Sequence, residues 1–392
     1  MVKKKNLRRV HNMNDRILVL SYYNPWISGG GHRPICLAEQ DINNGKQLLF
    51  CFESESEMEN MEDFPLYNHK NLLIFRRNPQ NNQIIAINNS AKNFSSSPMS
   101  DYELLIQWRP NYIRSHNPVE NFIELLRLSK NMNIIHIYDQ MDFWDAFPVQ
   151  PWGTNTESEY IKLSTACVTI SKYLQNKNPS FYLIPNGIKN SFLSKIHLNY
   201  DKIISRSKEK TKRIIYSGAI WPDWFDWSIV KDLIKLRPQY KFIFVGSYIP
   251  STDEDDNRNV SKIVSDLSKY SNVEFLGQVS HEQIIPLLQT SHAAIIPFVV
   301  NSVTEACSPL KLYEYLGAFL PTVSTMLPEI SGCPLLELAN NNQDFIHKLD
   351  LCVNMEISPK IYEDTDSFIH KNTWKNRIKM YDDIVNNLTK KR

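Results

Sequence analysis

The sequence predicts an α/β protein made of two Rossmann-like domains that face one another across a cleft. With 392 residues, the chain is long enough for two domains that each bury their own core. Short apolar runs alternate with helical patterns along both halves of the chain, as in the strand, helix, strand units of a parallel sheet. Between the halves, a stretch rich in Lys, Ser and Asn predicts a linker. The expected division is a basic tail at 1–14, a first domain at 15–188, the linker at 189–211, a second domain at 212–370 and a C-terminal helix at 371–392.

The net charge and the cysteines argue against several classes of protein. A formal net charge of +2 and a pI near 8.1 give no reason to expect nucleic acid as a partner. The six cysteines are scattered without a CxxC pair, which fits a reducing cytoplasm and indicates neither a zinc site nor disulfide bonds. No apolar run reaches the length of a membrane span, and residues 1–14 lack the apolar core of a signal peptide. We therefore expect a cytoplasmic protein.

Both ends of the chain are basic, with lysines and arginines at 3–5, 8–9 and 390–392. One interpretation is that these are disordered, solvated termini. The other is attraction to an anionic membrane surface, worth on the order of 1 kcal/mol for each basic residue close to the bilayer. Such peripheral contact at the inner face of the cell membrane would matter for a lipid substrate.

The first domain is expected to begin with a buried strand at 16–23. Three glycines at 29–31 follow as a loop, and apolar residues at helical spacing predict a helix at 32–44 that stops at Gly45. The loop matches the start of the GxGxxG dinucleotide fingerprint, but Pro34 stands in place of its third small residue. We therefore interpret it as a loop that lets a substrate approach the backbone. Further strands are expected at 47–53, 71–76, 84–88, 103–108, 133–138, 166–170 and 181–184, and helices at 117–130 and 156–165.

Carboxylates follow the predicted strand at 133–138. Asp139 and Asp142 come directly after it, and the carboxyl ends of parallel strands form the ligand-binding edge of an α/β sheet. Both are candidates for a general base. The alternative is that Asp142 or Asp145 only caps the next helix.

The second domain repeats the same pattern. Strands are expected at 212–216, 241–245, 273–275, 292–298 and 321–325, and helices at 225–236, 260–267, 281–288, 308–317, 343–349, 361–369 and 374–388. Acidic residues at 253–256 have the spacing of a magnesium site beside a diphosphate. They lie in a polar stretch, 251–259, with no apolar strand leading into it. We therefore interpret this stretch as a solvated loop and predict no required metal.

The most informative stretch runs from 299 to 325. Ser308 and Pro309 form a good helix start, because Ser can cap and Pro needs no donor at the first helical position. This helix would begin at the carboxyl edge of the sheet, where its free N–H groups favour an anion, most often a phosphate. Lys311 lies in its first turn, where a cation opposes the helix dipole and is better explained by a bound anion than by helix stability. Glu314 follows one turn later on the same face.

Three stretches resemble a glycosyltransferase of the GT-B fold, closest to family 4 and to the teichuronic acid biosynthesis type of group 1 glycosyltransferases. They are LIPNGI at 183–188, YSGAIWPDWFD at 216–226 and SPLKLYEYLGAFLPTVST at 308–325, of which the last is the most specific. The resemblance covers 181–325 well. It implies a GT-B architecture in which the last helix crosses back onto the first domain.

The resemblance also implies roles for single residues. Lys311 resembles the lysine that binds the donor diphosphate, and Glu314 the glutamate that accepts hydrogen bonds from the donor ribose. Gly218 resembles the glycine that lets the donor phosphates or an acceptor group approach the backbone. The rest of the expected donor site is Ser308, Pro309 and Leu310, and the expected acceptor-side loop comprises Gly30, Gly31, His32 and Arg33.

One position departs from the family pattern. Retaining members carry two glutamates separated by seven residues, which would place the first at Ala306, whereas this sequence has Glu305. Glu305 is a candidate for the sugar contact if the loop shifts it into place. Retention or inversion at the sugar therefore stays open, and an inverting enzyme would need a base such as Asp139 or Asp142.

The expected function is transfer of a sugar from a nucleotide-sugar donor to a glycan or lipid-linked acceptor in bacterial surface polysaccharide synthesis. We expect a metal-independent enzyme of the hexosyltransferase type without a cofactor. Two alternatives stay open: a nucleotide-sugar epimerase, which can share this fold, and a non-catalytic subunit that binds a partner glycosyltransferase. An epimerase would convert the donor without an acceptor, whereas a non-catalytic subunit would bind no nucleoside diphosphate.

Overall fold

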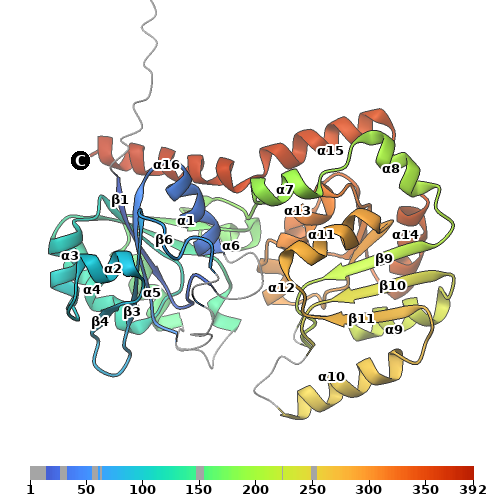
Figure 1. Ribbon diagram of the computed structural model, residues 1–392, viewed down its shortest axis with the longest axis horizontal. Helices are drawn as coiled ribbons and strands as arrows, with labels where there is room; N and C mark the ends of the chain where they lie inside the picture. Colours follow the sequence, from blue (N-terminus) through green and yellow to red (C-terminus); the bar gives the residue numbers. More distant parts are fainter. Residues whose placement is uncertain are drawn as a thin grey trace, which may run out of the picture.

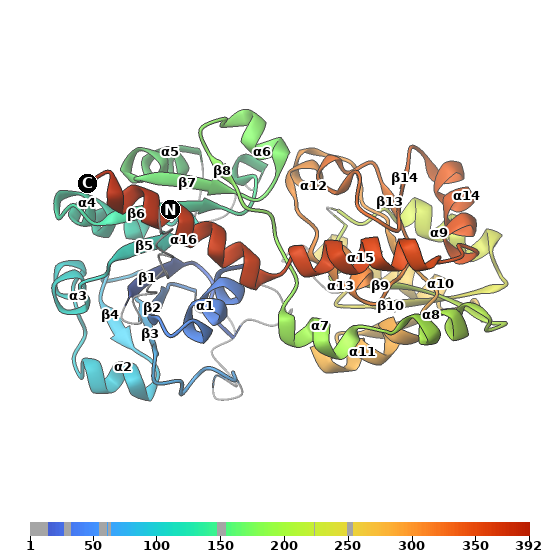
Figure 2. The same ribbon diagram turned by 90° about the horizontal axis from the view of Figure 1, so that it is seen from above.

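Two α/β halves lie side by side, each with a central sheet and helices on both faces (Figures 1 and 2). The computed structural model describes residues 15–26, 33–54, 61, 64–146, 154–222, 224–248 and 254–392. We call the part built on the eight-stranded sheet the first half and the part built on the six-stranded sheet the second half. The two parallel-rich sheets confirm the predicted α/β fold class.

The central strands of the first sheet are buried on both faces, whereas the edge strands β4 and β8 are partly exposed. They are β1 Arg16–Ser21, β2 Gln47–Phe52, β3 Leu72–Arg77, β4 Ile84–Ala86, β5 Tyr112–Ser115, β6 Ile135–Gln140, β7 Ala166–Thr169 and β8 Tyr182–Leu183. Their order is β4-β3-β2-β1-β5-β6-β7-β8, with only β3 and β4 antiparallel among the described strands. In β1, Leu18 and Leu20 enter one core while Ile17 and Val19 enter the core on the opposite face. Such strands read as continuous apolar runs, which is why the sequence predicts most of them.

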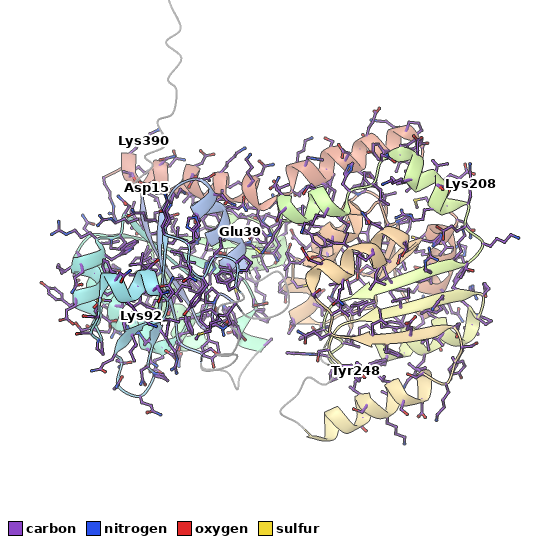
Figure 3. All side chains as sticks on the ribbon, in the orientation of Figure 1. Asp15, Glu39, Lys92, Lys208, Tyr248 and Lys390 are labelled. Carbon is purple, nitrogen blue, oxygen red and sulfur yellow. The ribbon has the colours of Figure 1, made fainter. Side chains whose placement is uncertain are left out.

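The second sheet is parallel throughout its described strands. These are β9 Lys212–Ser217, β10 Tyr240–Val245, β11 Val273–Gly277, β12 Ala293–Ile296, β13 Thr322–Thr325 and β14 Leu336–Ala339. Their order is β11-β10-β9-β12-β13-β14, so the winding direction reverses between β9 and β12. In open α/β sheets, ligands bind outside the carboxyl ends of the strands at such a reversal point. This carboxyl edge, where Tyr248 follows β10, is turned toward the first half (Figures 1 and 3).

Helices cover the faces of both sheets. Those between strands of the first sheet are α1 Arg33–Asn43, α2 Asn89–Phe94, α3 Asp101–Trp108, α4 Ile123–Asn131, α5 Thr154–Leu163 and α6 Lys172–Lys177, with short 3-10 turns η2 Glu120–Phe122 and η3 Trp144–Ala146. The later ones are α7 Asn190–Ile196, α8 Tyr200–Ser207, α9 Trp227–Leu236, α10 Glu254–Leu267, α11 His281–Thr290, α12 Ser302–Ala306, α13 Leu310–Gly317, η4 Pro328–Ile330, α14 Asn342–Val353, α15 Pro359–Lys371 and α16 Trp374–Lys390.

The predicted strand at 103–108 is wrong, because these residues belong to the helix α3. The Ser100 hydroxyl accepts a hydrogen bond from the Glu103 backbone N–H at 3.3 Å, and the Glu103 carboxylate accepts one from the Ser100 N–H at 2.8 Å. This is a capping box, a strong local signal for a helix start. Leu104 and Trp108, four residues apart, are buried on the face that packs on the first half. The consecutive apolar residues therefore belong to a helix face and not to a strand.

Two segments interpreted as loop or linker are helical. Residues 189–211 contain α7 and α8, and their buried side chains, including Phe192 and Leu193, join the core of the second half. The interpretation of 251–259 as a loop is corrected from Glu254 onward, where α10 begins. Asp253 lies outside the described residues.

The last helix, α16, returns to the first half and lies along it (Figure 2). Trp374, Ile378 and Tyr381 are buried there, in the core that contains Ile17 and Val19. Lys390, near the end of α16, lies at the same end of the first half as Asp15 (Figure 3). The crossing that the family resemblance implies is therefore confirmed.

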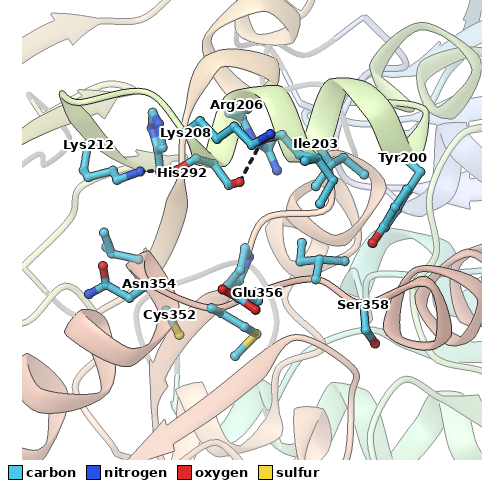
Figure 4. A pocket seen from close by; sticks show the side chains of 16 residues that line it. Tyr200, Ile203, Arg206, Lys208, Lys212, His292, Cys352, Asn354, Glu356 and Ser358 are labelled. Atoms are coloured by element: carbon cyan, nitrogen blue, oxygen red, sulfur yellow. Dashed lines mark hydrogen bonds between the residues drawn. The ribbon is translucent and has the colours of Figure 1, made fainter.

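A cavity of about 560 Å³ lies on the far side of the second half from the cleft, between α8 and residues 352–358 (Figure 4). It is lined by the amino ends of strands and not by their carboxyl ends. The Arg206 guanidinium at its wall donates to the carbonyls of Ala318 at 2.9 Å and Phe319 at 2.7 Å. Lys212 donates to the carbonyl of Ser207 at 2.5 Å. These cations therefore stabilise the carboxyl ends of the helices α13 and α8.

Candidate active site

The start of α13 has no side-chain cap. Pro309 is its N-cap residue, with φ −68°, and no side chain accepts a capping hydrogen bond there. The predicted Ser308 cap is corrected, because the Ser308 hydroxyl instead accepts a hydrogen bond from the backbone N–H of Asn186 at 3.3 Å. The N–H of Leu312 reaches the carbonyl of Pro309 at 3.2 Å. The uncapped first turn, which carries Lys311, can therefore bind an anion through backbone N–H groups.

The amino group of Lys311 lies among aromatic rings. It is 4.2 Å from the ring centre of Phe298 and 4.7 Å from that of Tyr216, and it donates to the Tyr216 hydroxyl at 3.2 Å. Loss of hydration lowers the pKa of Lys311 to about 8. Such rings attract a cation only modestly, so a bound anion would supply most of the missing stabilisation.

Gly218 and Lys311, which are 93 positions apart in the chain, are neighbours in the structure. Gly218 follows β9 with φ +135°, and a Cβ atom there would lie 3.0 Å from Lys311 Cε and 3.2 Å from its Nζ. A side chain at 218 would thus occupy the space beside the ammonium group. Lys311 and Gly218, which the family resemblance assigns to the same donor site, therefore lie side by side.

Gly246, at the carboxyl end of β10, was not among the predicted site residues. Its φ is +140°, and a Cβ atom there would lie 2.0 Å from the Gly218 carbonyl oxygen. Only glycine fits this position, and its small size lets the Gly218 loop lie against β10. The sequence does contain a signal for this position. Gly246 directly follows a buried strand, and the neighbouring strand β9 is followed by another glycine, Gly218.

The other predicted donor residues of α13 face the region between the halves. Glu314 is half-buried, and its charge acts on Lys311 in the second half and on Lys189 and Cys36 beside it, so it lies within electrostatic range of both halves. Leu310 packs against the first-half core that contains α16. The amino end of α13 therefore contacts the first half directly.

Glu305 and Ala306 lie on the short helix α12. Ala306 is 1% exposed and packs in a core cluster of the first half. Glu305 is half-buried and precedes it, so the two side chains point about 100° apart around the helix. The Glu305 carboxylate therefore does not occupy the place of the Ala306 side chain.

The two aspartates near the end of β6 have different surroundings. Asp139 lies within the strand and not after it as predicted, whereas Asp142 follows the strand. Asp139 is fully buried, with its Oδ2 atom 2.8 Å from Arg33 Nε and 3.0 Å from His116 Nδ1. Burial alone would raise its pKa, but the charge of Arg33 and the contact with His116 lower it well below the ordinary value. A carboxylate held in this way is a poor proton acceptor. Arg33, predicted for the acceptor-side loop, is itself only 4% exposed, and its Nε atom forms the ion pair with Asp139.

Asp142 has the opposite behaviour, because burial raises its pKa to about 7. Burial raises the pKa of Tyr23 to about 12, and the negative charge of Asp142 adds to this effect. The same charge adds to the effect of burial on Cys307 in the second half, whose pKa is also raised. Asp142 thus lies between the halves, near the residue that precedes Ser308. After the 3-10 turn η3, the next α-helix begins at Thr154.

Gly30, Gly31 and His32 of the predicted acceptor-side loop lie outside the described residues. Within the described ranges, no group of three or more His, Cys, Asp or Glu side chains is arranged to hold a metal ion. Of the helices that the structure describes, none combines the length and apolar character needed to cross a bilayer.

The family Glycosyl transferases group 1 matches residues 211–350 of the chain. Among curated proteins, a teichuronic acid biosynthesis glycosyltransferase of Bacillus subtilis, TuaH, is 24% identical over 162 residues. This match covers 41% of the present chain and 38% of TuaH, so it spans well under half of that relative.

Solved structures resemble almost the whole chain. HepE of Anabaena in complex with UDP has a TM-score of 0.67 at 12% identity, covering 95% of this chain and all of that one. A glycosyltransferase of Rickettsia africae gives 0.68 at 13% identity, covering 97% and 100%. Sucrose-phosphate synthase of Thermosynechococcus elongatus gives 0.66 at 11% identity, covering 96% and 100%. The protein therefore has the GT-B glycosyltransferase fold, with a group 1 glycosyltransferase domain over residues 211–350.

Proposed function

We propose that the protein transfers a sugar from a nucleotide-sugar donor to a glycan or lipid-linked acceptor in bacterial surface polysaccharide synthesis. The observation that carries this proposal is the contact of Gly218 with Lys311 at the uncapped start of α13. It combines a cation, free N–H groups and a glycine beside the ammonium group at the reversal point of a parallel sheet. HepE, a neighbour in fold, has been solved with UDP and with UDP-glucose, which supports a donor of this class.

The chemistry requires negative charge to be stabilised on the departing nucleoside diphosphate. In the proposed reaction, an acceptor hydroxyl oxygen bonds to the anomeric carbon as the bond from that carbon to the diphosphate breaks. Lys311 and the N–H groups of the first turn of α13 stabilise the charge that develops on the leaving phosphate, without a metal ion. Glu314 accepts hydrogen bonds from the donor ribose. The acceptor proton passes to a carboxylate on the first half or to the departing phosphate.

The direct test is donor binding by thermal shift against a panel of nucleotide sugars and nucleoside diphosphates, with and without chelator. A ligand at a hundred times its dissociation constant stabilises the folded state by about 2.7 kcal/mol. We expect such a shift with at least one nucleoside diphosphate, and the same shift in EDTA. A donor that is converted without any acceptor would favour the epimerase. The absence of any nucleoside diphosphate binding would favour the non-catalytic subunit.

Asp142 is the better placed of the two aspartates for general base catalysis. Because the carboxylate form accepts the proton, kcat/KM should rise with pH through about 7 and then level off. Asp142→Asn should lower kcat by about 10² to 10⁴ and remove this pH dependence. Asp145→Asn, a change at an exposed neighbour, provides the matched control. If Asp142→Asn retained both the rate and the pH profile, Asp142 would not be the base.

The basic termini fit peripheral contact with an anionic membrane, which would bring the enzyme to a lipid-linked acceptor. Each basic residue near the surface would contribute on the order of 1 kcal/mol, so binding should weaken as salt is added.

A further inference from the structure

The two chain segments that connect the halves meet at one junction, formed by residues 186–188 and 372–374. The N–H of Ile188 donates to the carbonyl of Asn372 and the N–H of Trp374 to the carbonyl of Ile188, both at 3.0 Å. At Gly187 an added Cβ atom would lie 2.8 Å from the Asn372 carbonyl oxygen. Glycine is therefore required for the segments to pair this closely, which gives the PNG sequence a structural reason.

Asn186 lies at the centre of this junction and is 8% exposed. Its side-chain amide donates through Nδ2 to the carbonyl of Ser308 at 2.8 Å, and its Oδ1 accepts from Arg33 Nη1 at 3.1 Å. Its backbone N–H donates to the Ser308 hydroxyl at 3.3 Å, and its carbonyl accepts from Arg377 Nε at 3.0 Å. One residue thus connects α1, α16 and the chain that leads into α13.

The contact with Ser308 acts on the position of the anion site. Ser308 immediately precedes Pro309, the N-cap of α13, and the proline ring restricts the backbone between them. Fixing the Ser308 carbonyl therefore fixes the direction of the first turn of the helix, including the Lys311 backbone N–H. A change in direction at this point would move the donor groups of the helix relative to Gly218.

The other end of the contact is rigid as well. Arg33, which binds the Asn186 side chain, also donates to Asp139 at 2.8 Å and to the Tyr381 hydroxyl at 3.0 Å. All three partners of this guanidinium are buried in the first half or at the junction. The hydrogen bonds therefore form a continuous buried connection from β6 and α16, through Arg33 and Asn186, to the start of α13.

We propose that Asn186 is a positioning residue for the donor site: its side-chain amide holds the start of α13, and through it Lys311, in a fixed relation to the first half. This inference rests on the proposed function, because it assumes that the start of α13 binds a nucleoside diphosphate. The buried hydrogen bonds at the junction would then affect the affinity for the nucleoside diphosphate as well as the stability of the fold.

Asn186→Asp tests the role in affinity. The substituted carboxylate keeps an acceptor for Arg33, so the first-half contact is preserved, but it replaces the Nδ2 donor with an oxygen facing the Ser308 carbonyl. The lost hydrogen bond and the unpaired acceptor should also lower the urea midpoint, so affinity is compared at a temperature where the variant is fully folded. Under these conditions we expect the dissociation constant for UDP to rise about tenfold, because the start of α13 is no longer held by the side-chain amide. In the transfer assay the donor KM should rise by a similar factor, with kcat changed less than threefold.

Asn372→Ala is the matched control at the same junction. The Asn372 side chain donates to the Phe368 carbonyl at 2.7 Å and accepts from Arg377, but its side-chain hydrogen bonds do not involve Ser308. Its loss should leave the dissociation constant for UDP within twofold of the wild type. A tenfold loss in this control as well would assign the effect to loosening of the junction and overturn the specific role of Asn186.

The measurement is isothermal titration with UDP, GDP, ADP and dTDP, and the variants are compared with the nucleotide that the wild type binds most tightly. Failure of the wild type to bind any of them would contradict the proposed function itself. Binding by the wild type together with equal binding by a folded Asn186→Asp would overturn only the present inference. If Asn186→Asp fails to fold, Asn186→Ala titrated at low temperature serves instead, and unchanged affinity in that variant has the same meaning.

Discussion

Replacing Lys311 with methionine is expected to lower kcat/KM by about 10² to 10³, the cost of removing one group that stabilises developing negative charge. Methionine has a similar length and fits between the rings of Phe298 and Tyr216, so the change removes the charge with little change of shape. Steady-state kinetics with the identified donor measure the loss, and titration with the nucleoside diphosphate shows whether binding falls with it. Lys235→Met, at an exposed position in the last turn of α9, should leave activity unchanged.

The same substitution should not destabilise the protein in the absence of a ligand. Because the pKa of Lys311 is lowered in the folded state, folding disfavours its charged form at every pH below about 8. Lys311→Met relieves this cost, so its urea midpoint at pH 7 should equal or exceed that of the wild type. The difference should shrink as the pH rises from about 8 toward the ordinary lysine value near 10.4, where the unfolded chain also loses the proton. A strongly destabilised variant would instead indicate a structural role for the ammonium group.

Gly246→Ala is expected to have the largest effect on stability of any single change discussed here, about 4 kcal/mol or more. The added Cβ atom would lie 2.0 Å from the Gly218 carbonyl oxygen and 2.6 Å from its carbonyl carbon. These are backbone atoms that cannot rotate away as a side chain can, and φ of +140° is a conformation that alanine rarely adopts. The Gly218 loop would have to move, and nucleotide binding beside Lys311 should be lost with it.

Gly332→Ala separates the clash from the backbone strain. Gly332 also has a positive φ, +81°, but no atom outside its neighbours lies within 4 Å of the added Cβ. Its replacement should cost only the strain of a left-handed alanine, about 1 to 2 kcal/mol. Urea unfolding followed by tryptophan fluorescence compares the two variants. Equal loss of stability in both would show that the contact between Gly246 and Gly218 contributes nothing beyond the conformation of each glycine.

The fold was predictable because its signals are local. Strands buried on both faces appear as short apolar runs, and their alternation with helical patterns indicates a parallel sheet. The error at 103–108 arose where Leu104 and Leu105 resemble such a run, although Ser100 and Glu103 mark the start of a helix. The two helices within 189–211 were missed because only a few of their side chains are apolar, and those few are buried against the second half.

The candidate site was predictable only in part. Lys311 and Gly218 were expected from sequence motifs, and the structure places them in contact. Asp139 is paired with Arg33, whereas burial raises the pKa of Asp142. The sequence around the two aspartates does not show this difference, because Arg33 lies 106 residues away from Asp139 in the chain. The same is true of Asn186 and Ser308, which are 122 residues apart. Pairings across such distances depend on the packing of the whole chain.

The return of α16 to the first half has a consequence for biosynthesis. Trp374, Ile378, Tyr381 and Ile384 fill positions in a core whose other buried members come from the first half, between Ile17 and Ile184. During translation, domains generally fold from the N-terminus onward, but this core lacks those four side chains until residues 374–384 have been made. Part of the apolar surface of the first half therefore stays uncovered while the second half is synthesised. During this time the second half can complete its own sheet. Truncation of the last turns of the chain would extend that exposed state indefinitely.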